Sequence, residues 1–167
     1  MRHVVVAVIT VLICFDLSLT PAAAPDERES LRRLPGVFLV IERIDRHAQE
    51  DGLSEETVRS SAQLLLTSNG IRILTFSEFA ENVASQPLLD VHIDTSRSSG
   101  NAYSFCVAVQ LRQRVYLVHR PDPHMWSTTW EHRRKGISGP RDIKIVGNAV
   151  EELLKEFAKD FLAVNPR

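Results

Sequence analysis

The sequence has 167 residues, of which 44% are hydrophobic and 25% are charged, and its formal net charge is −1. This balance excludes the strongly basic character of nucleic-acid binding proteins, so we predict no nucleic-acid partner. The length suits one domain built around a single core.

The first 24 residues have the pattern of a secretory signal peptide: a basic start, an apolar run over 4–15 and small residues over 21–24. The apolar run is shorter than the roughly 20 residues that span a membrane, so we predict no membrane span. Ile13 precedes Cys14, whereas lipid attachment needs a small residue there, so we predict no lipid anchor. The protein is therefore expected to be exported, to a bacterial periplasm or to the extracellular space.

The chain after the signal begins with a charged segment. Residues 25–34 precede a Pro-Gly pair and are predicted to be a flexible leader. Residues 35–167 then form a single α+β domain. Cys106 is the one cysteine left after signal cleavage, so packing rather than an internal disulfide must hold this domain together.

The first half of the domain has the pattern of a strand, a helix and a strand. Residues 37–41 are apolar at both odd and even positions, which predicts an internal strand over 37–43. Ser54 is a suitable N-cap for a helix over 54–69, which an Asn-Gly pair ends. A short strand over 71–75 would then complete a right-handed parallel crossover.

Two alternating segments follow a short helix over 77–84. Residues 88–95 and 103–118 carry apolar side chains at odd positions, which is typical of half-buried strands. A five-residue loop over 96–100 predicts a hairpin between them. This loop sets the cross-strand pairs as Ile93 with Tyr103, Val91 with Phe105, and Leu89 with Val107.

A second hairpin is predicted at the breaker 120–123, with His119 opposite His124. This register places both Trp126 and Trp130 on the apolar face of the sheet, in the core. Residues 133–140 are basic and contain two glycines, so we predict a flexible loop. A long amphipathic helix over 141–163 closes the domain.

These elements define an α+β fold with a mixed, mostly antiparallel sheet of about five strands. We expect the helices over 54–69 and 141–163 to pack on one face of that sheet. Odd-numbered side chains of the long strand should point toward the helices.

The predicted hairpin gathers residues that could form a hydrolytic triad on the other face. His92 would lie opposite Ser104, with Asp90 and Asp94 beside it and Cys106 on the diagonal. Catalysis also needs oxyanion donors and a pocket that excludes water, and the sequence has no nucleophile elbow. A solvated sheet face explains the same residues, so a hydrolase is the alternative interpretation.

No metal or other cofactor is predicted. His119 and His124 are neighbours in the second hairpin, but His132 lies about eight residues of roughly 3.3 Å away. The loop over 133–139 has the glycines and cations of an anion site but lacks the P-loop spacing.

The nominally polar face also carries apolar side chains. Phe38, Val40, Tyr116 and Val118, together with Cys106 and Ala108 in the middle of the long strand, would give it a weakly polar surface. Sheets with such a face often use it to bind a partner. Cover by the leader or self-association would account for it equally well.

The overall pattern resembles small exported bacterial domains of the lipopolysaccharide-assembly lipoprotein and curli-secretion type, in which two helices pack on one side of a mixed sheet. The run ELLKEFAKDFLAVNP at 152–166 resembles the ending of uncharacterised exported bacterial proteins. The resemblance implies no catalytic motif. The sequence therefore favours a non-catalytic binding or assembly module of the envelope, which engages a protein or an apolar ligand through a sheet face or edge.

Overall fold

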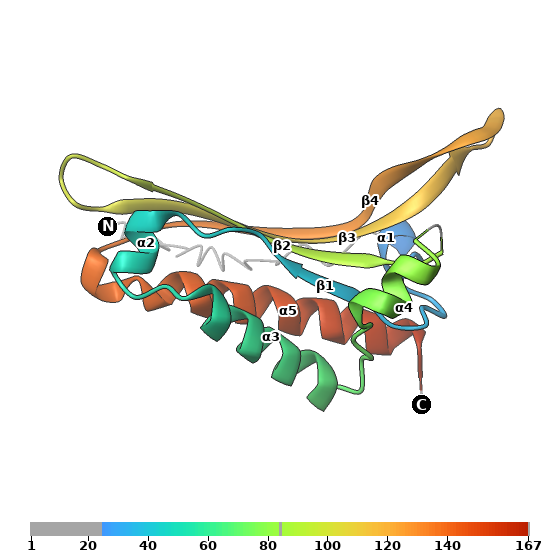
Figure 1. Cartoon of the computed structure of the whole chain (residues 1–167), viewed down its shortest axis with the longest axis horizontal. Coiled ribbons are helices and arrows are strands. Elements are labelled where there is room, and N and C mark those ends of the chain that lie inside the picture. Colours follow the sequence, from blue (N-terminus) through green and yellow to red (C-terminus); the bar gives the residue numbers. More distant parts are fainter. Residues whose placement is uncertain (1–24, 84, 167) are drawn as a thin grey trace, which may run out of the picture.

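In the computed structural model, residues 25–83 and 85–166 are described, and the predicted signal peptide over 1–24 lies outside them. The four strands belong to one sheet, and two long helices lie beside it (Figure 1). In chain order the elements are α1 (Pro25–Glu29), β1 (Phe38–Ile41), α2 (Arg46–Glu50), α3 (Glu55–Ser68), α4 (Phe76–Glu81), β2 (Leu88–Arg97), β3 (Tyr103–Leu117), β4 (Arg120–Ser138), the 3-10 turn η1 (Pro140–Asp142) and α5 (Lys144–Val164).

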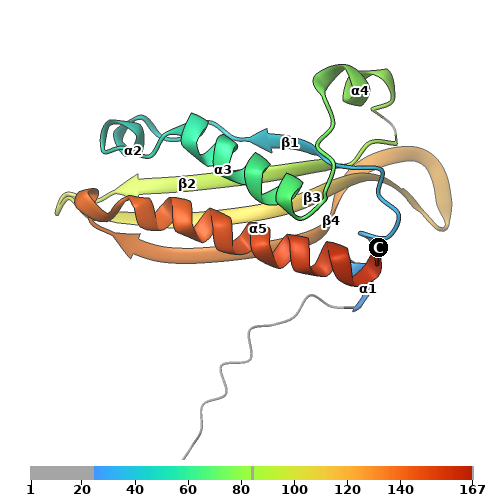
Figure 2. The ribbon, with the colours of Figure 1, turned by 90° about the horizontal axis from the view of Figure 1, so that it is seen from below.

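The sheet has the order β1-β2-β3-β4, with β1 parallel to β2 and the other two pairings antiparallel. Helices α3 and α5 cover one face of it (Figures 1 and 2). The α+β class and the two packed helices are therefore confirmed. Among the described residues, no helix, α5 included, combines the length and apolar character that a membrane crossing requires.

The predicted count of about five strands is wrong within the described residues, because 71–75 is not a strand. Its pairing with the chain before β1 is limited to one parallel bridge, between Val37 and Ile73. A capping box between Thr75 and Glu78 starts α4 directly afterwards, so the pairing cannot continue. As a result β1 lies at the edge of the sheet, where an internal strand was predicted.

The prediction that odd-numbered side chains of the long strand point toward the helices is confirmed for its first half. The odd residues from Tyr103 to Leu111 are all buried toward the helices. They meet the apolar stripe of α5, which includes Val150, Leu154 and Phe157. Each large side chain buried in this way stabilises the fold by about 1.5–3 kcal/mol.

The register of the β2–β3 hairpin differs from the prediction by four residues. Ile93 pairs with Val107, not Tyr103, and the strands extend to a pair between Arg97 and Tyr103. The turn therefore lies over 98–102, where Asn101 adopts a left-handed conformation (φ 64°). Because the shift is an even number of residues, the same side chains still point toward the helices although the predicted cross-strand pairs are wrong.

The β3–β4 hairpin also departs from the prediction, because it turns tightly after Leu117, which pairs with Arg120. The prolines that follow are tolerated in β4 because it is an edge strand. Trp130 pairs with Leu111 and is fully buried, as expected. A register shift next to Leu111 leaves one extra residue in β4, so Trp126 pairs with Arg114 on the helix-free face and not in the core.

The predicted basic loop over 133–140 is strand for most of its length. Strand β4 continues to Ser138 and pairs with the first half of β3. Gly136 lies opposite Phe105, whose ring covers it so closely that a Cβ would lie 2.6 Å from the ring. The glycine is thus a packing requirement of the sheet rather than a sign of flexibility.

The segment predicted as a loose leader is packed against the domain. Arg28 of α1 forms an ion pair with Asp160 of α5 at 3.1 Å, and Leu31 is fully buried. The side chain of Asn165 donates a hydrogen bond to the Leu31 carbonyl. These contacts tie both ends of the described chain to each other at one end of α5 (Figure 2).

Candidate functional site

The helix-free face of the sheet holds most of the side chains that the sequence singled out. In its middle lies a shallow groove of about 370 Å³. Its lining is mainly charged or polar and comes from all four strands or their ends: Glu42, Asp90, His92, Asp94, Cys106, Ala108, Gln110, Arg112 and Arg133.

The proposed triad residues do not converge in this groove. His92 pairs with Ala108, whereas Ser104 pairs with Ser96, four residues further along the strand. Four residues of extended chain separate the two positions by about 13 Å. The ring of His92 instead contacts the Glu42 carboxylate through Nδ1, and the Ser104 hydroxyl donates to the Ser96 carbonyl.

Asp90 is the buried carboxylate of the groove, with 6% of its surface exposed. Its Oδ1 atom accepts no hydrogen bond from the described residues, and Oδ2 lies 3.9 Å from the Arg112 guanidinium. Burial raises the pKa of the Asp90 carboxyl and the Glu42 carboxylate raises it further, while Arg112 and His92 oppose the change. Asp94, by contrast, is exposed and faces Cys106.

Two of the three histidines considered as metal ligands make other contacts. His132 lies 2.6 Å from the Glu156 carboxylate and stacks on Trp130, so it joins β4 to α5. His124 packs edge-on against Tyr116. No group of three or more possible metal-ligating side chains occurs within 25–83 and 85–166.

The four predicted binding residues lie toward one end of the helix-free face, in two groups. Phe38 and Val40 on β1 are half-buried, and Phe38 stacks on Phe79 of α4 with ring centroids 4.4 Å apart. Tyr116 and Val118 lie at the end of the β3–β4 hairpin and are exposed to 61% and 93%. Figures 1 and 2 show α4 and this hairpin at the same end of the molecule.

Trp126 connects these two groups. Its ring lies 6.5 Å from that of Phe79, and the Arg114 guanidinium lies 6.0 Å over it. A small, almost wholly apolar hollow of about 280 Å³ opens between α4 and the hairpin. Its lining consists of Phe79, Val83, Leu88, Arg112 and Trp126.

We call this end of the molecule the apolar end. Large apolar side chains that are exposed by more than a third gather there from α4, the segment after it and the hairpin: Phe76, Val83, Tyr116, Leu117, Val118 and Met125. Exposed apolar side chains that gather at one end of a protein often mark an interaction site.

Phe76 was not among the binding residues predicted from the sequence, and Trp126 was predicted to lie in the core. The Thr75-x-x-Glu78 capping box could have located the first, since it starts the helix at Phe76 and puts Phe76 and Phe79 on the same side. Nothing in the sequence marks the bulge that turns Trp126 to the helix-free face.

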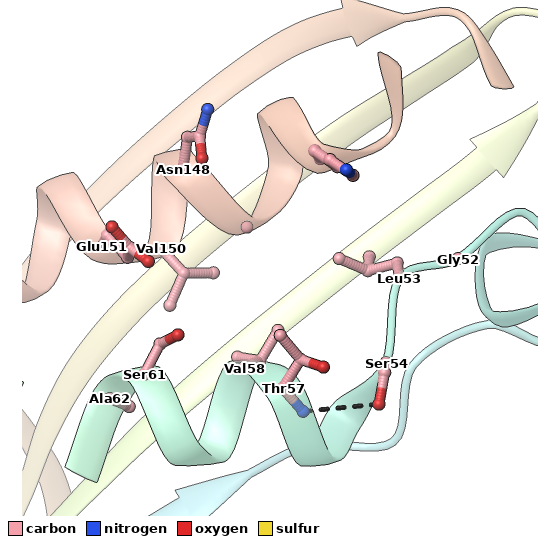
Figure 3. A pocket seen from close by; sticks show the side chains of 12 residues that line it. Gly52, Leu53, Ser54, Thr57, Val58, Ser61, Ala62, Asn148, Val150 and Glu151 are labelled. Carbon is pink, nitrogen blue, oxygen red and sulfur yellow. Dashed lines mark hydrogen bonds between the residues drawn. The ribbon is translucent and has the colours of Figure 1, made fainter. Parts of the chain in front are cut away.

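A second hollow of about 350 Å³ lies between α3 and α5, on the far side of the sheet (Figure 3). Val58 and Val150 face each other across its floor, and Ser54, Thr57 and Asn148 lie on its rim. The Ser54 hydroxyl caps α3 by accepting from the Thr57 amide at 3.3 Å. Among the described residues that line this hollow, no buried side-chain nitrogen or oxygen lacks a hydrogen-bond partner.

The chain matches no protein-family model and no curated protein. Among solved structures it is similar to a crystal structure of a minor lipoprotein from Acinetobacter baumannii, at 10% identity and a TM-score of 0.36. The match covers 78% of this chain and 94% of that chain. A likeness at this level does not extend to function, and the resemblance to lipopolysaccharide-assembly and curli-secretion proteins stays a prediction.

Proposed function

We propose that the protein is a non-catalytic binding module, exported to the bacterial envelope, that engages its target through the apolar end. The signal-like residues 1–24 support the location. The observation that carries the binding role is the exposed apolar surface formed by α4 and the β3–β4 hairpin.

The two long helices and the N-terminal segment of the described chain leave this surface exposed. Helices α3 and α5 lie on the opposite face of the sheet (Figure 1). The N-terminal segment packs against α5 through Arg28 and Leu31 and contacts the hairpin at its base, where the Gln113 side chain donates a hydrogen bond to the Ser30 carbonyl. Tyr116 and Val118, further along the hairpin, stay exposed to 61% and 93%, so among the described residues this part of the surface is open to another molecule.

The hydrolase interpretation has no comparable support. Its nucleophile and its base lie four residues apart along the sheet, and the ring nitrogen Nδ1 of His92 is engaged by Glu42. The groove around them is open and shallow, so it does not exclude water as acyl transfer requires.

Site-specific photo-crosslinking tests the binding role. A photo-reactive amino acid replaces Tyr116 in one variant and Ile137 in a control; Ile137 is 77% exposed and lies on β4 far from the hairpin end. With a bacterial envelope fraction, we expect adducts from position 116 only, and we expect Val118→Asp to abolish them. Equal adducts from both positions, or none from position 116, would contradict the proposal.

A further inference from the structure

The end of the β3–β4 hairpin, residues 113–126, is an arm that extends beyond the rest of the sheet. Strand β2 pairs with β3 only as far as the pair between Leu88 and Arg112. Beyond Arg112, β3 and β4 pair with each other alone, and Figure 1 shows them bending away from the helices. A two-stranded ribbon has no core of its own. Its one described ring contact with a helix lies at the base, between Trp126 and Phe79 of α4.

The arm carries apolar side chains on both of its faces. Val115 pairs with Met125 on one side, while Tyr116 and Trp126 lie on the other. Val118 at the turn is 93% exposed. The rest of the sheet differs, since its apolar face is buried and its helix-free face is largely polar. A protein surface would cover one face of the ribbon, whereas a lipid interface surrounds an inserted tip on every side.

The charges of the arm complement an anionic surface. Residues 113–126 contain two arginines and two histidines against a single aspartate, and Arg112 directly precedes them. Arg112 and Arg114 lie at the base, on the side where Arg114 contacts Trp126. Basic and amphipathic aromatic residues next to apolar ones are typical of segments that bind the membrane interface. Like charges would also oppose the association of two arms.

We propose that the arm inserts into the headgroup region of an anionic lipid surface and so holds the protein at a membrane. The inference rests on the proposed function, because it names the target of the same apolar end. Insertion must be shallow, since the outer backbone groups of a two-stranded ribbon need water or headgroups as hydrogen-bond partners. Val118, Leu117 and Tyr116 lie deepest, and Arg112 and Arg114 at the base of the arm remain at the level of the phosphates.

Vesicle binding tests this directly. The exported protein is mixed with vesicles of phosphatidylcholine alone or with 30% phosphatidylglycerol, and the bound fraction is measured by sedimentation. We expect binding to the anionic vesicles that weakens at high salt. Val118→Asp should lower the partition coefficient by about tenfold or more, because a carboxylate then enters the interface. Ile137→Asp is the matched control, with the same change at an exposed apolar site outside the arm, and it should bind as the parent does.

The outcomes separate this inference from the proposed function. If the protein binds neither vesicle, or if Val118→Asp binds as well as Ile137→Asp, lipid insertion is wrong. If vesicle binding fails while the Tyr116 crosslinks to an envelope protein persist, the target is a protein and only the lipid inference falls. If sedimentation velocity shows a dimer that Val118→Asp dissolves and no vesicle binding, self-association replaces it. If vesicle binding and crosslinks are both absent, both proposals fall.

Discussion

Asp160 joins three parts of the chain that lie far apart in the sequence. It is 5% exposed, and its Oδ2 accepts a hydrogen bond at 3.1 Å from the indole nitrogen of the fully buried Trp130. Its Oδ1 lies 3.1 Å from Nε of Arg28, without the alignment of a hydrogen bond, so that contact is an ion pair. The change Asp160→Ala removes both contacts at once.

The expected loss in the free energy of unfolding follows from the groups that Asp160→Ala leaves without a partner. A buried indole N–H without an acceptor costs about 1–3 kcal/mol. The ion pair is worth about 0–1 kcal/mol, because a third of the Arg28 side chain is exposed. Asp160→Ala should therefore lower the free energy of unfolding by about 1–4 kcal/mol. For a domain of this size the melting temperature would fall by roughly 2–16 °C.

Urea and thermal unfolding, followed by circular dichroism and tryptophan fluorescence, measure this cost. Two variants separate its parts. Arg28→Ala removes the ion pair alone and should cost about 0–1 kcal/mol. Asp160→Asn keeps an oxygen that can accept from the indole and should cost about 1–2 kcal/mol. If Asp160→Ala proves no more destabilising than Arg28→Ala, the buried indole does not depend on this carboxylate and the reasoning is refuted.

Three further changes test other parts of the structure. Gly136→Ala should destabilise the fold by about 1–3 kcal/mol, because its Cβ would meet the Phe105 ring; a double-mutant cycle with Phe105→Leu should recover part of the loss, and purely additive effects would argue against the contact. Gly147→Ala should stabilise it by about 0.5–1 kcal/mol in urea unfolding, since a Cβ in this helical position meets nothing within 4 Å; a loss of stability would contradict the open packing there. The pKa of the Asp90 carboxyl is raised in the folded state, so this carboxyl binds its proton more tightly there than in the unfolded chain. Its contribution to stability is therefore largest below the ordinary carboxyl pKa and declines as the pH rises through the raised pKa. Asp90→Asn should therefore raise the melting temperature at neutral pH and flatten that decline; an unchanged pH profile of stability would show that the Asp90 pKa is not raised.

The candidate site was partly visible in the sequence. Tyr116 and Val118 were identified as apolar residues on a polar face, and both are exposed at the hairpin end. Phe38 and Val40 are half-buried, because α4 packs over β1 through Phe79. The position of α4 depends on how the chain returns from α3 to the sheet, which no local pattern records.

Features that repeat along one segment could be predicted from local patterns of residues. Period-two alternation over 103–111 and the helical stripe of α5 each specify which side chains face inward, because every residue of a regular element repeats the same geometry. Both are found in the structure.

The pairings between segments depend on the whole fold and could not be predicted from local patterns. Alternation is unchanged by a shift of two or four residues, so it could not distinguish Ile93 opposite Tyr103 from Ile93 opposite Val107. The bulge beside Trp130 likewise reverses the phase of Trp126 without any local sign. Register and bulges depend on how turns close and how side chains from distant segments fit together, and those choices set the length of the arm and the composition of the apolar end.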